Sequence, residues 1–314
     1  MELKFIIFSD GNFSMLSLTK LNFEPVELAH ADMLKAAFSE QGYRTCGFTV
    51  GSAIMWQKIY DLKVCEAFGC VIISADYPRE GKCYSVPVGG DVKAAVNAVY
   101  EKCKNSGEPC VFSDVPEGGL ELLKEIFGEE KLKISTDDGW SDYLYNASDL
   151  ITYSGKKFNG QRNHVNRFNR LYPDTVFEPI TRENFDEAYE FLKNYISQNG
   201  DNSKSGELEG CAAIRLMKRY FELELCGAIL KANNKIISIS LGEKIGDTLF
   251  VHVEKGLIEF GGVYQVMVQK FAEAYAGDVL YINREEDDGV EGLRKSKLSY
   301  HPICLLNKYS VEIM

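Results

Sequence analysis

Short apolar runs alternate with amphipathic segments along the whole chain. Runs rich in β-branched and other apolar residues predict strands in the first half at 21–26, 62–66, 69–74, 83–91, 110–115 and 131–135. Helical spacing of apolar residues predicts helices at 27–39, 92–104 and 119–127. Residues 42–55 mix glycine with aromatic and β-branched residues, which favours a strand and a turn. The apolar run at 5–8 predicts a first strand or an ordered leader.

The same kinds of element follow again after Pro173. Strands are predicted at 175–180, 279–283 and 303–313, and three more within 227–256. Turns at Asn233–Asn234 and Gly246–Asp247 separate those three strands. Helices are predicted at 181–197, 209–222, 261–275 and 293–298, and a polar loop at 198–206.

The two halves share an order of elements. In each, a strand ends in a glycine-containing turn that leads into an amphipathic helix and a further strand, at 83–115 and at 249–283. A chain of 314 residues also exceeds one typical domain. The sequence therefore predicts an α+β protein built from two copies of one module. We expect lobes at 1–150 and 173–314, joined by a connector helix at 151–172.

The connector contains a strongly basic stretch. Gly155–Arg170 has five formal positive charges and no acid, within a chain of net charge −11. Read as a helix at about 100° per residue, it places Arg162 and Asn166 beside an apolar stripe. That stripe consists of Phe158, Val165, Phe168 and Tyr172. Arg162 then either faces a cleft near His252 and Asn283, or belongs to a solvated basic face.

Composition excludes several classes of protein. A sequence pI near 5.0 argues against a protein that coats nucleic acid. No apolar run approaches the ~20 residues of a membrane-spanning helix, and the N-terminal residues lack the features of a secretory signal. The nine cysteines form no CxxC pair and suit a reducing cytoplasm, where we expect this protein. The four histidines do not cluster with them, so no metal site is expected.

Three nucleotide and hydrolase motifs are missing. The chain contains no GxxxxGK[ST], no strand-linked GxGxxG and no GxSxG. These absences argue against an NTPase, a nicotinamide dehydrogenase and an α/β-hydrolase.

Candidate acid–base chemistry lies in TLFVHVEK, residues 248–255. Strand alternation places Phe250, His252 and Glu254 on one face. The turn at Gly261–Gly262 then enters a helix, whose N-terminal N–H groups and dipole favour phosphate or carboxylate. An imidazole and a carboxylate before such a turn are candidates for a general base. The alternative is an edge strand with a polar outer face.

A second candidate site lies in YINREEDDGVEGLRKSKLSYHP, residues 281–302. Arg294 and Lys297 share one helical face, opposite an acidic turn. That turn contains Asn283, Arg284, Glu285, Glu286, Asp287 and Asp288. It lacks the alternating oxygen ligands of a calcium loop, so it favours a ligand with both an amine and an anionic group. The alternative is an acidic turn with its own salt bridges.

Three blocks of sequence occur in one order: DYLYNASDLITYSGKKFNGQRNHVNRF, then VHVEKG with GGVYQ, then INREEDDGVEGLRKSKLSYHP. Together they resemble the C-terminal-domain family of phosphatidylglycerol lysyltransferase. The resemblance implies two tandem lobes of the GNAT (acyl-CoA N-acyltransferase) fold, each a mixed central sheet flanked by helices. It also implies transfer of an aminoacyl group from aminoacyl-tRNA. The acceptor is phosphatidylglycerol in the founding members and a peptidoglycan precursor in the related Fem-type transferases.

The sequence departs from these relatives in two places. The multi-span membrane region of the lipid-modifying members has no counterpart in it. Acyl-CoA members of the fold carry an R/Q-x-x-G-x-G/A turn that holds the pyrophosphate. Here that place reads Glu259-Phe260-Gly261-Gly262, without the preceding cation. This departure weakens the case for coenzyme A.

The expected function is an acyl- or aminoacyl-transferase acting on an amine or hydroxyl. Aminoacyl transfer from an aminoacyl-tRNA-type donor is the leading hypothesis, with tRNA and a lipid or peptide acceptor as partners. One alternative is an acyl-CoA-dependent N-acetyltransferase. The other is a non-catalytic binder of a small molecule or peptide on the same scaffold. No cofactor is expected beyond the acyl-CoA or aminoacyl-tRNA donor itself.

This hypothesis gives each candidate residue a role. Glu254 or His252 takes a proton from the nucleophile, and the turn at Gly261–Gly262 binds an anionic group or orients the carbonyl. Glu285 and Asp287 hold the amino group of the donor. The groups expected to bind phosphate or another anion are Arg162, Asn166, Arg294 and Lys297. The remaining substrate-binding residues are Asn163, Tyr264, Asn283 and Arg284.

Overall fold

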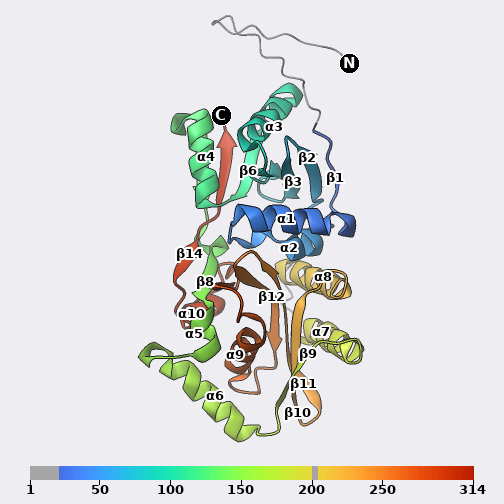
Figure 1. Ribbon diagram of the computed structural model, residues 1–314, viewed down its shortest axis with the longest axis vertical. Helices are drawn as coiled ribbons and strands as arrows, with labels where there is room; N and C mark the ends of the chain where they lie inside the picture. Colours follow the sequence, from blue (N-terminus) through green and yellow to red (C-terminus); the bar gives the residue numbers. More distant parts are fainter. Residues whose placement is uncertain (1–20, 200–203) are drawn as a thin grey trace, which may run out of the picture.

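The computed structural model describes residues 21–199 and 204–314. Two mixed β-sheets follow one another along the long axis of the molecule, with α1 (Ala31–Gln41) and α2 (Val50–Trp56) between them (Figure 1). Helices flank each sheet, so the predicted α+β fold with two lobes is confirmed. In the described ranges no helix combines the length and the apolar character that crossing a bilayer requires.

The first sheet is built mainly from the N-terminal half. Its strand order is β1-β2-β3-β4-β6-β15-β7, and β5 pairs with β3. Among its strands in the described residues, only β4 and β6 pair in parallel. The strands are β1 (Glu24–Pro25), β2 (Lys63–Ala67), β3 (Cys70–Tyr77), β4 (Gly81–Tyr84), β5 (Val88–Gly89), β6 (Cys110–Val115), β7 (Leu132–Thr136) and β15 (Tyr309–Ile313). The helices α3 (Val92–Ser106) and α4 (Glu117–Phe127) pack their apolar faces against it.

The second sheet has the order β14-β8-β13-β12-β11-β10-β9. In the part of the chain that the structure describes, β12 and β13 are the only parallel pair of this sheet. Its strands are β8 (Asp142–Asn146), β9 (Val176–Pro179), β10 (Cys226–Ala232), β11 (Lys235–Ile245), β12 (Thr248–Gly256), β13 (Tyr281–Asn283) and β14 (Cys304–Leu306). The helices of this lobe are α5 (Ala147–Thr152), α6 (Asn159–Leu171), α7 (Phe185–Asn199), α8 (Lys204–Lys218), α9 (Val263–Tyr275) and α10 (Glu291–Leu298).

Two strands pair with the sheet of the other half of the chain. β8 lies before the boundary expected at residue 150, yet it pairs with β13 and β14 in the second sheet. β15 is the last strand in sequence, yet it pairs with β6 and β7 in the first sheet. Figure 1 shows it running back beside α4. The domain limits 1–150, 151–172 and 173–314 stay a prediction, and the sheets do not follow them residue by residue.

Most of the segment 42–55 is helical, at 46–48 and 50–55, so the predicted strand and turn are wrong there. A 3-10 turn spans Cys46–Phe48 and is followed by α2. Thr49 caps α2, because its hydroxyl accepts a hydrogen bond from the Ser52 N–H at 3.2 Å. Residues 50–55 are all buried between the two sheets. A helix buried on every side has no polar stripe, and its sequence resembles that of a buried strand.

The two lobes share apolar cores. Ile245 and Phe250 of the second sheet pack in one cluster with Phe48 and Ile54 of the first lobe. On the other side of α2, Met55 packs among residues of α7 and α8. The apolar run at 5–8 and residues 200–203 of the predicted loop lie outside the described residues, and α8 begins directly after that gap.

Candidate active site

Charged side chains gather where β12 and β13 separate in the second sheet. The two strands pair in parallel from Thr248 to Phe250 of β12 only, although β12 continues to Gly256. Beyond that point two ion pairs join the elements on either side: His252–Glu285 and Glu254–Arg284.

A β-bulge in β12 sends these ion pairs to opposite faces of the sheet. Two consecutive residues of β11 lie opposite Val251 and Val253, so His252 is the extra residue. Strict alternation would put Val251 and Val253 on one face. Instead Val251 packs in the cluster around α5 and α9, and Val253 packs in the cluster around α7 and α8. His252 and Glu254 therefore do not share a face as the alternation predicts.

His252 is completely buried and lies between two carboxylates. Its Nε2 is 2.8 Å from Glu243 Oε1, and its Nδ1 is 2.7 Å from Glu285 Oε1. Burial lowers the pKa of His252, but the hydrogen bonds and charges of the two carboxylates raise it further, to about 10. At neutral pH His252 is thus an imidazolium that donates from both ring nitrogens. In this state it cannot accept a proton.

Gly51 of α2, in the first lobe, packs directly against His252 and Glu243. The Gly51 N–H donates a hydrogen bond to Glu243 Oε1. A Cβ at position 51 would lie 2.6 Å from His252 Nε2 and 2.6 Å from Glu243 Oε1. Only a glycine lets the α2 backbone approach this closely.

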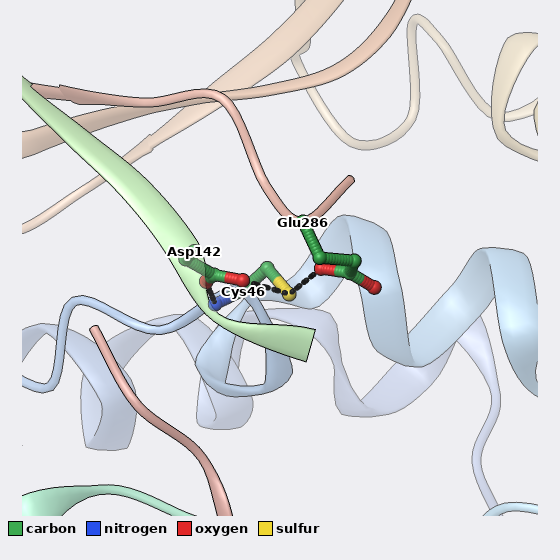
Figure 2. A group of neighbouring side chains, drawn as sticks. All are labelled: Cys46, Asp142 and Glu286. Atoms are coloured by element: carbon green, nitrogen blue, oxygen red, sulfur yellow. Dashed lines mark hydrogen bonds between the residues drawn. The ribbon is translucent and has the colours of Figure 1, made fainter. Parts of the chain in front are cut away.

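Lys308 is a second buried cation at the boundary of the lobes. Its Nζ lies 2.8 Å from Asp142 Oδ1, 3.0 Å from Glu286 Oε2 and 3.4 Å from Cys46 Sγ. Asp142 also accepts from the Cys46 N–H at 2.6 Å and from the Asn283 side-chain amide at 2.9 Å. Figure 2 shows the Cys46 thiol between the carboxylates of Asp142 and Glu286.

Ligand atoms of Cys46, Asp142 and Glu286 lie within 4.8 Å of one another, a spacing that a metal ion could bridge. Lys308 Nζ is within 3.4 Å of all three side chains, so its ammonium supplies the positive charge there. Burial raises the pKa of the Cys46 thiol well above its ordinary value, and the neighbouring carboxylates raise it further. A thiol that stays protonated is a poor metal ligand.

The acids in this region outnumber the bases. The interlobe cluster, as we define it, consists of Asp142, Glu243, His252, Glu285, Glu286 and Lys308. Burial raises the pKa of Asp142 and of Glu285 despite their cationic partners. Burial also disfavours the Glu286 carboxylate, but Lys308 lowers its pKa to about 2. Four carboxylates face two cations, and Glu285 and Glu286 remain 22% and 30% exposed.

The opposite face of the sheet holds the Glu254–Arg284 pair. Arg284 Nη2 lies 2.8 Å from Glu254 Oε1, and the two side chains are 9% and 14% exposed, in that order. The guanidinium lies over the Tyr300 ring at 4.5 Å from its centroid, with the Tyr145 ring at 5.9 Å. Nε and Nη1 of Arg284 and the hydroxyl of Tyr300 are buried without a hydrogen-bond partner.

A cavity of about 10 Å³ adjoins this pair. Glu254 and Arg284 supply its polar lining, and its other lining residues are apolar and come from α5, β12, α9 and β13. This space admits one oxygen-sized group. Charge is balanced on this face, whereas hydrogen bonding is incomplete.

Several residues that were predicted to bind a ligand instead form hydrogen bonds within the acidic turn and the helix after it. Asp287 accepts from Arg294 Nε at 2.9 Å, from the Tyr143 hydroxyl at 2.5 Å and from the Gly289 N–H at 2.8 Å. Lys297 Nζ donates to the carbonyls of residues 284–286. The hydrogen bonds of Arg294 and Lys297 are therefore internal. Their phosphate-binding role and the amine-binding role of Asp287 stay predictions.

The connector helix α6 lies at the end of the second lobe away from the first (Figure 1). Arg162 donates to the carbonyls of Tyr153 and Gly155, just after α5, and to the Asn159 side chain. Asn163 and Asn166 are exposed. The structure thus brings His252, Asn283 and Glu285 together, and Glu254 and Arg284 together. It does not bring the three α6 residues to either group.

α6 instead covers the glycine turn before α9. Gly262 has a φ of +103°, and a Cβ there would lie 2.9 Å from the His164 carbonyl oxygen of α6. Tyr264, in the first turn of α9, bonds through its hydroxyl to the Gly256 backbone at 3.1 and 3.2 Å. Gly262 is thus packed against the connector, whereas Gly261 is exposed and has nothing within 4 Å of its Cβ position.

A family profile described as phosphatidylglycerol lysyltransferase, C-terminal, matches residues 41–312. The match includes the whole second sheet, the first sheet except β1 and the last residue of β15, and every residue of the interlobe cluster. The protein belongs to this family. The resemblance found in the three sequence blocks is confirmed.

Solved structures share the fold of this protein. A conserved protein of unknown function from Bacteroides thetaiotaomicron VPI-5482 is 32% identical, with a TM-score of 0.88 over 94% of this chain and 100% of its own. L-PGS from Bacillus licheniformis is 14% identical, with a TM-score of 0.62 over 93% of each chain. FemX is 10% identical, with a TM-score of 0.59 over 94% of this chain and 98% of its own. The last two show the fold, the tandem GNAT arrangement.

A curated relative is more distant. The uncharacterized protein MYCGA3080 of Mycoplasmoides gallisepticum (strain R(low / passage 15 / clone 2)) is 24% identical over 197 residues. The alignment spans 62% of this chain and 62% of that protein.

The family blocks contain Glu254, Arg284 and every residue of the interlobe cluster except Glu243 and Lys308. Asp142, Glu243, Glu286 and Lys308 were given no site role from the sequence. Lys308 carries one signal in the sequence, since it is the only charged residue within the apolar run ICLLNKYSV at 303–311. Asp142 and Glu243 begin or continue strands like ordinary polar residues, and their burial depends on contacts with the other lobe.

Proposed function

We propose that this protein is an aminoacyltransferase that moves an aminoacyl group from an aminoacyl-tRNA-type donor to a hydroxyl or an amine. The observation that carries the proposal is the acid excess of the interlobe cluster, whose exposed members are Glu285 and Glu286. A donor with a cationic amino group supplies positive charge to these carboxylates. An acetyl group has no such charge. Family membership over residues 41–312 supports the same reaction class.

Glu254 is the residue that we assign to proton transfer. His252 is already protonated at neutral pH, whereas Glu254 is partly exposed and shares one oxygen with Arg284. Glu254 takes the proton of the attacking hydroxyl or amine, whose oxygen or nitrogen bonds to the carbonyl carbon of the donor. The ester bond to the ribose oxygen breaks, and that oxygen receives the proton back from Glu254. His252 holds Glu243 and Glu285 in place.

An acyl-CoA donor fits the same site less well. In acyl-CoA members of the fold, the turn before the helix binds the pyrophosphate. In this chain α6 packs against Gly262, and the turn has Glu259 where those members carry a cation or an amide. Both observations favour the aminoacyl donor.

The test is a transfer assay with purified protein. The donors are transfer RNAs charged with labelled amino acids, and the acceptors are phosphatidylglycerol vesicles and a short peptide with a free amine. We expect label on one acceptor, and transfer that is ~10²–10⁴-fold slower with Glu254→Gln, because a general base contributes that much. The matched control is Glu209→Gln, since Glu209 pairs with Lys255 at the surface. Transfer from acetyl-CoA, with none from any charged tRNA, would reject the proposal.

A further inference from the structure

Unsatisfied buried donors concentrate at one place in this protein. Among residues 21–199 and 204–314, six buried side-chain nitrogen and oxygen atoms lack a hydrogen-bond partner. Three of the six belong to Arg284 and Tyr300, which are in contact through the guanidinium and the ring. Buried polar groups are nearly always paired, so three such atoms at one contact require an explanation.

Burial makes these donors costly to the fold. The Arg284 side chain is 91% buried, since its exposed fraction is 9%. The Tyr300 hydroxyl lies near both Arg284 and Tyr153 but makes a hydrogen bond of good geometry to neither. Each unsatisfied donor forfeits its hydration without gaining a partner. Groups left in this state are often part of a site, where a ligand completes their hydrogen bonds.

The donors stand beside the residue that we assign to proton transfer. Arg284 Nη2 binds Glu254, which leaves Nε and Nη1 directed elsewhere. Glu254 and Arg284 together form the polar lining of the 10 Å³ cavity, whose other walls are apolar. The space accepts one oxygen atom with its van der Waals shell, and a whole ligand does not fit. Tyr300 is not part of this lining but contacts Arg284 beside it. An acceptor atom at the end of a larger group is the occupant that matches the Arg284 donors and the volume.

We propose that Arg284 and Tyr300 bind the carbonyl oxygen of the transferred group and stabilise its negative charge in the transition state. The inference rests on the proposed function and adds the residues that recognise the acyl carbon. Burial keeps the Tyr300 hydroxyl protonated, because its pKa is raised far above neutrality. Arg284 stays a cation, since the charge of Glu254 outweighs the effect of burial on its pKa. Both groups are therefore donors at neutral pH.

The acceptor oxygen or nitrogen forms a bond to the carbonyl carbon, its proton passes to Glu254, and the electron pair of the C=O double bond moves onto oxygen. That oxygen accepts hydrogen bonds from Arg284 and Tyr300, in a site of low dielectric where such bonds are strong. When the C=O bond forms again, the ribose oxygen leaves and takes the proton from Glu254.

Tyr300→Phe tests the assignment most directly. The variant removes a hydroxyl that has no partner in the fold, so we expect an unchanged or higher melting temperature. We also expect kcat to fall by ~10²–10³-fold with little change in KM, since one oxyanion donor is worth that factor. The matched control is Tyr153→Phe, whose hydroxyl donates to the Gln265 carbonyl at 3.0 Å. That control should lose stability and keep kcat.

Arg284→Lys separates recognition from charge. Lysine keeps the positive charge opposite Glu254 but loses the planar set of donors. If Arg284 only pairs with Glu254, Arg284→Lys keeps kcat and the inference is wrong. Loss of kcat in both Arg284→Lys and Tyr300→Phe, with both proteins folded, supports it. Full activity in Tyr300→Phe overturns the role of Tyr300.

A binding assay decides the inference even without turnover. The probes are amino-acid amides, each compared by calorimetry with the amine that lacks its carbonyl. We expect an amide to bind the wild type at least ~10-fold more tightly than its amine, because the lost carbonyl leaves the donors unpaired. Arg284→Gln should abolish that preference. Equal binding of amide and amine, or no binding of either, overturns the inference. Absence of transfer from every charged tRNA instead rejects the proposed function and leaves this comparison standing.

Discussion

Buried charges have different partners on the two faces of the second sheet, near the point where β12 and β13 separate. On the face toward the first lobe, the cations His252 and Lys308 each contact two carboxylates. On the other face, Arg284 contacts one carboxylate and keeps two nitrogens without a partner. The first face gives each cation two carboxylate partners and has more acidic groups than cations. The second has balanced charge and too few acceptors.

This difference indicates that the cations of the first face stabilise the fold, whereas the donors of the second face take part in the reaction. A cation held by several partners fixes the backbone around it, and both cations of the interlobe cluster join elements of both lobes through those partners. Unsatisfied donors do the opposite, since they lower the stability of the fold and raise its affinity for a ligand. We therefore expect substitutions of the two cations on the first face to affect mainly stability, and substitutions of Arg284 and Tyr300 on the second to affect mainly rate.

Lys308→Met gives the largest expected loss of stability. It leaves Asp142 and Glu286 without their cation, and breaking a buried ion pair in this way costs about 3–5 kcal/mol. Urea denaturation followed by circular dichroism measures the free energy of unfolding. The control is Lys133→Met, because Lys133 pairs with Glu312 at the surface and should change little. Equal effects of the two substitutions would contradict the conclusion that Lys308 stabilises the boundary between the lobes.

Arg284→Met should cost less, about 1–3 kcal/mol, although it also removes a buried cation. Its loss leaves Glu254 unpaired but eliminates two unsatisfied donors. The same denaturation experiment compares it with Lys308→Met. A loss as large as that of Lys308→Met would erase the contrast between the faces.

Gly51→Ala tests how closely the first lobe is held against His252. The added methyl group would meet His252 and Glu243 at 2.6 Å, so we expect about 1–3 kcal/mol of destabilisation from overpacking. Gly160→Ala in α6 is the control, since nothing lies within 4 Å of its Cβ position. That change should stabilise the helix by up to about 1 kcal/mol. Two effects of the same sign would show that the contact at Gly51 is loose.

The raised pKa of His252 predicts that the free energy of unfolding depends on pH. Its folded pKa of about 10 lies above the ordinary value of 6.5, so the folded state holds the proton more tightly. The stabilising contribution is complete below about pH 6.5 and is lost as the pH rises toward about 10. Between these values the free energy of unfolding should fall more steeply in the wild type than in His252→Gln. Parallel curves would mean that His252 is neutral in the fold.

The lobes, the repeated unit and most elements could be predicted because they depend on local pattern. The turn at Asn233–Asn234 is confirmed, with φ of 51° and 57°, and so is Gly246, with φ of 56°. The sequence also singled out Glu254 and Arg284, which form an ion pair in the structure.

Contacts over long distances in sequence could not be predicted. A β-bulge adds one residue to a strand without a mark in the sequence, and this one moved His252 away from Glu254. α2 is buried by both lobes, so its sequence lacks the polar stripe by which helices are recognised. Lys308 meets Cys46 and Asp142 only because the last strand pairs with the first sheet.

That last strand also governs the order in which the protein can be completed during synthesis. β6 and β7 do not pair with each other, because β15 lies between them. The ribosome synthesises the N-terminal half first. The edges of β6 and β7 stay unpaired until residues 309–313 are made, after the strands and helices of the second lobe. A nascent chain therefore holds an open first lobe until residues 309–313 are made, and it gains the interlobe lysine in the same event that closes the sheet.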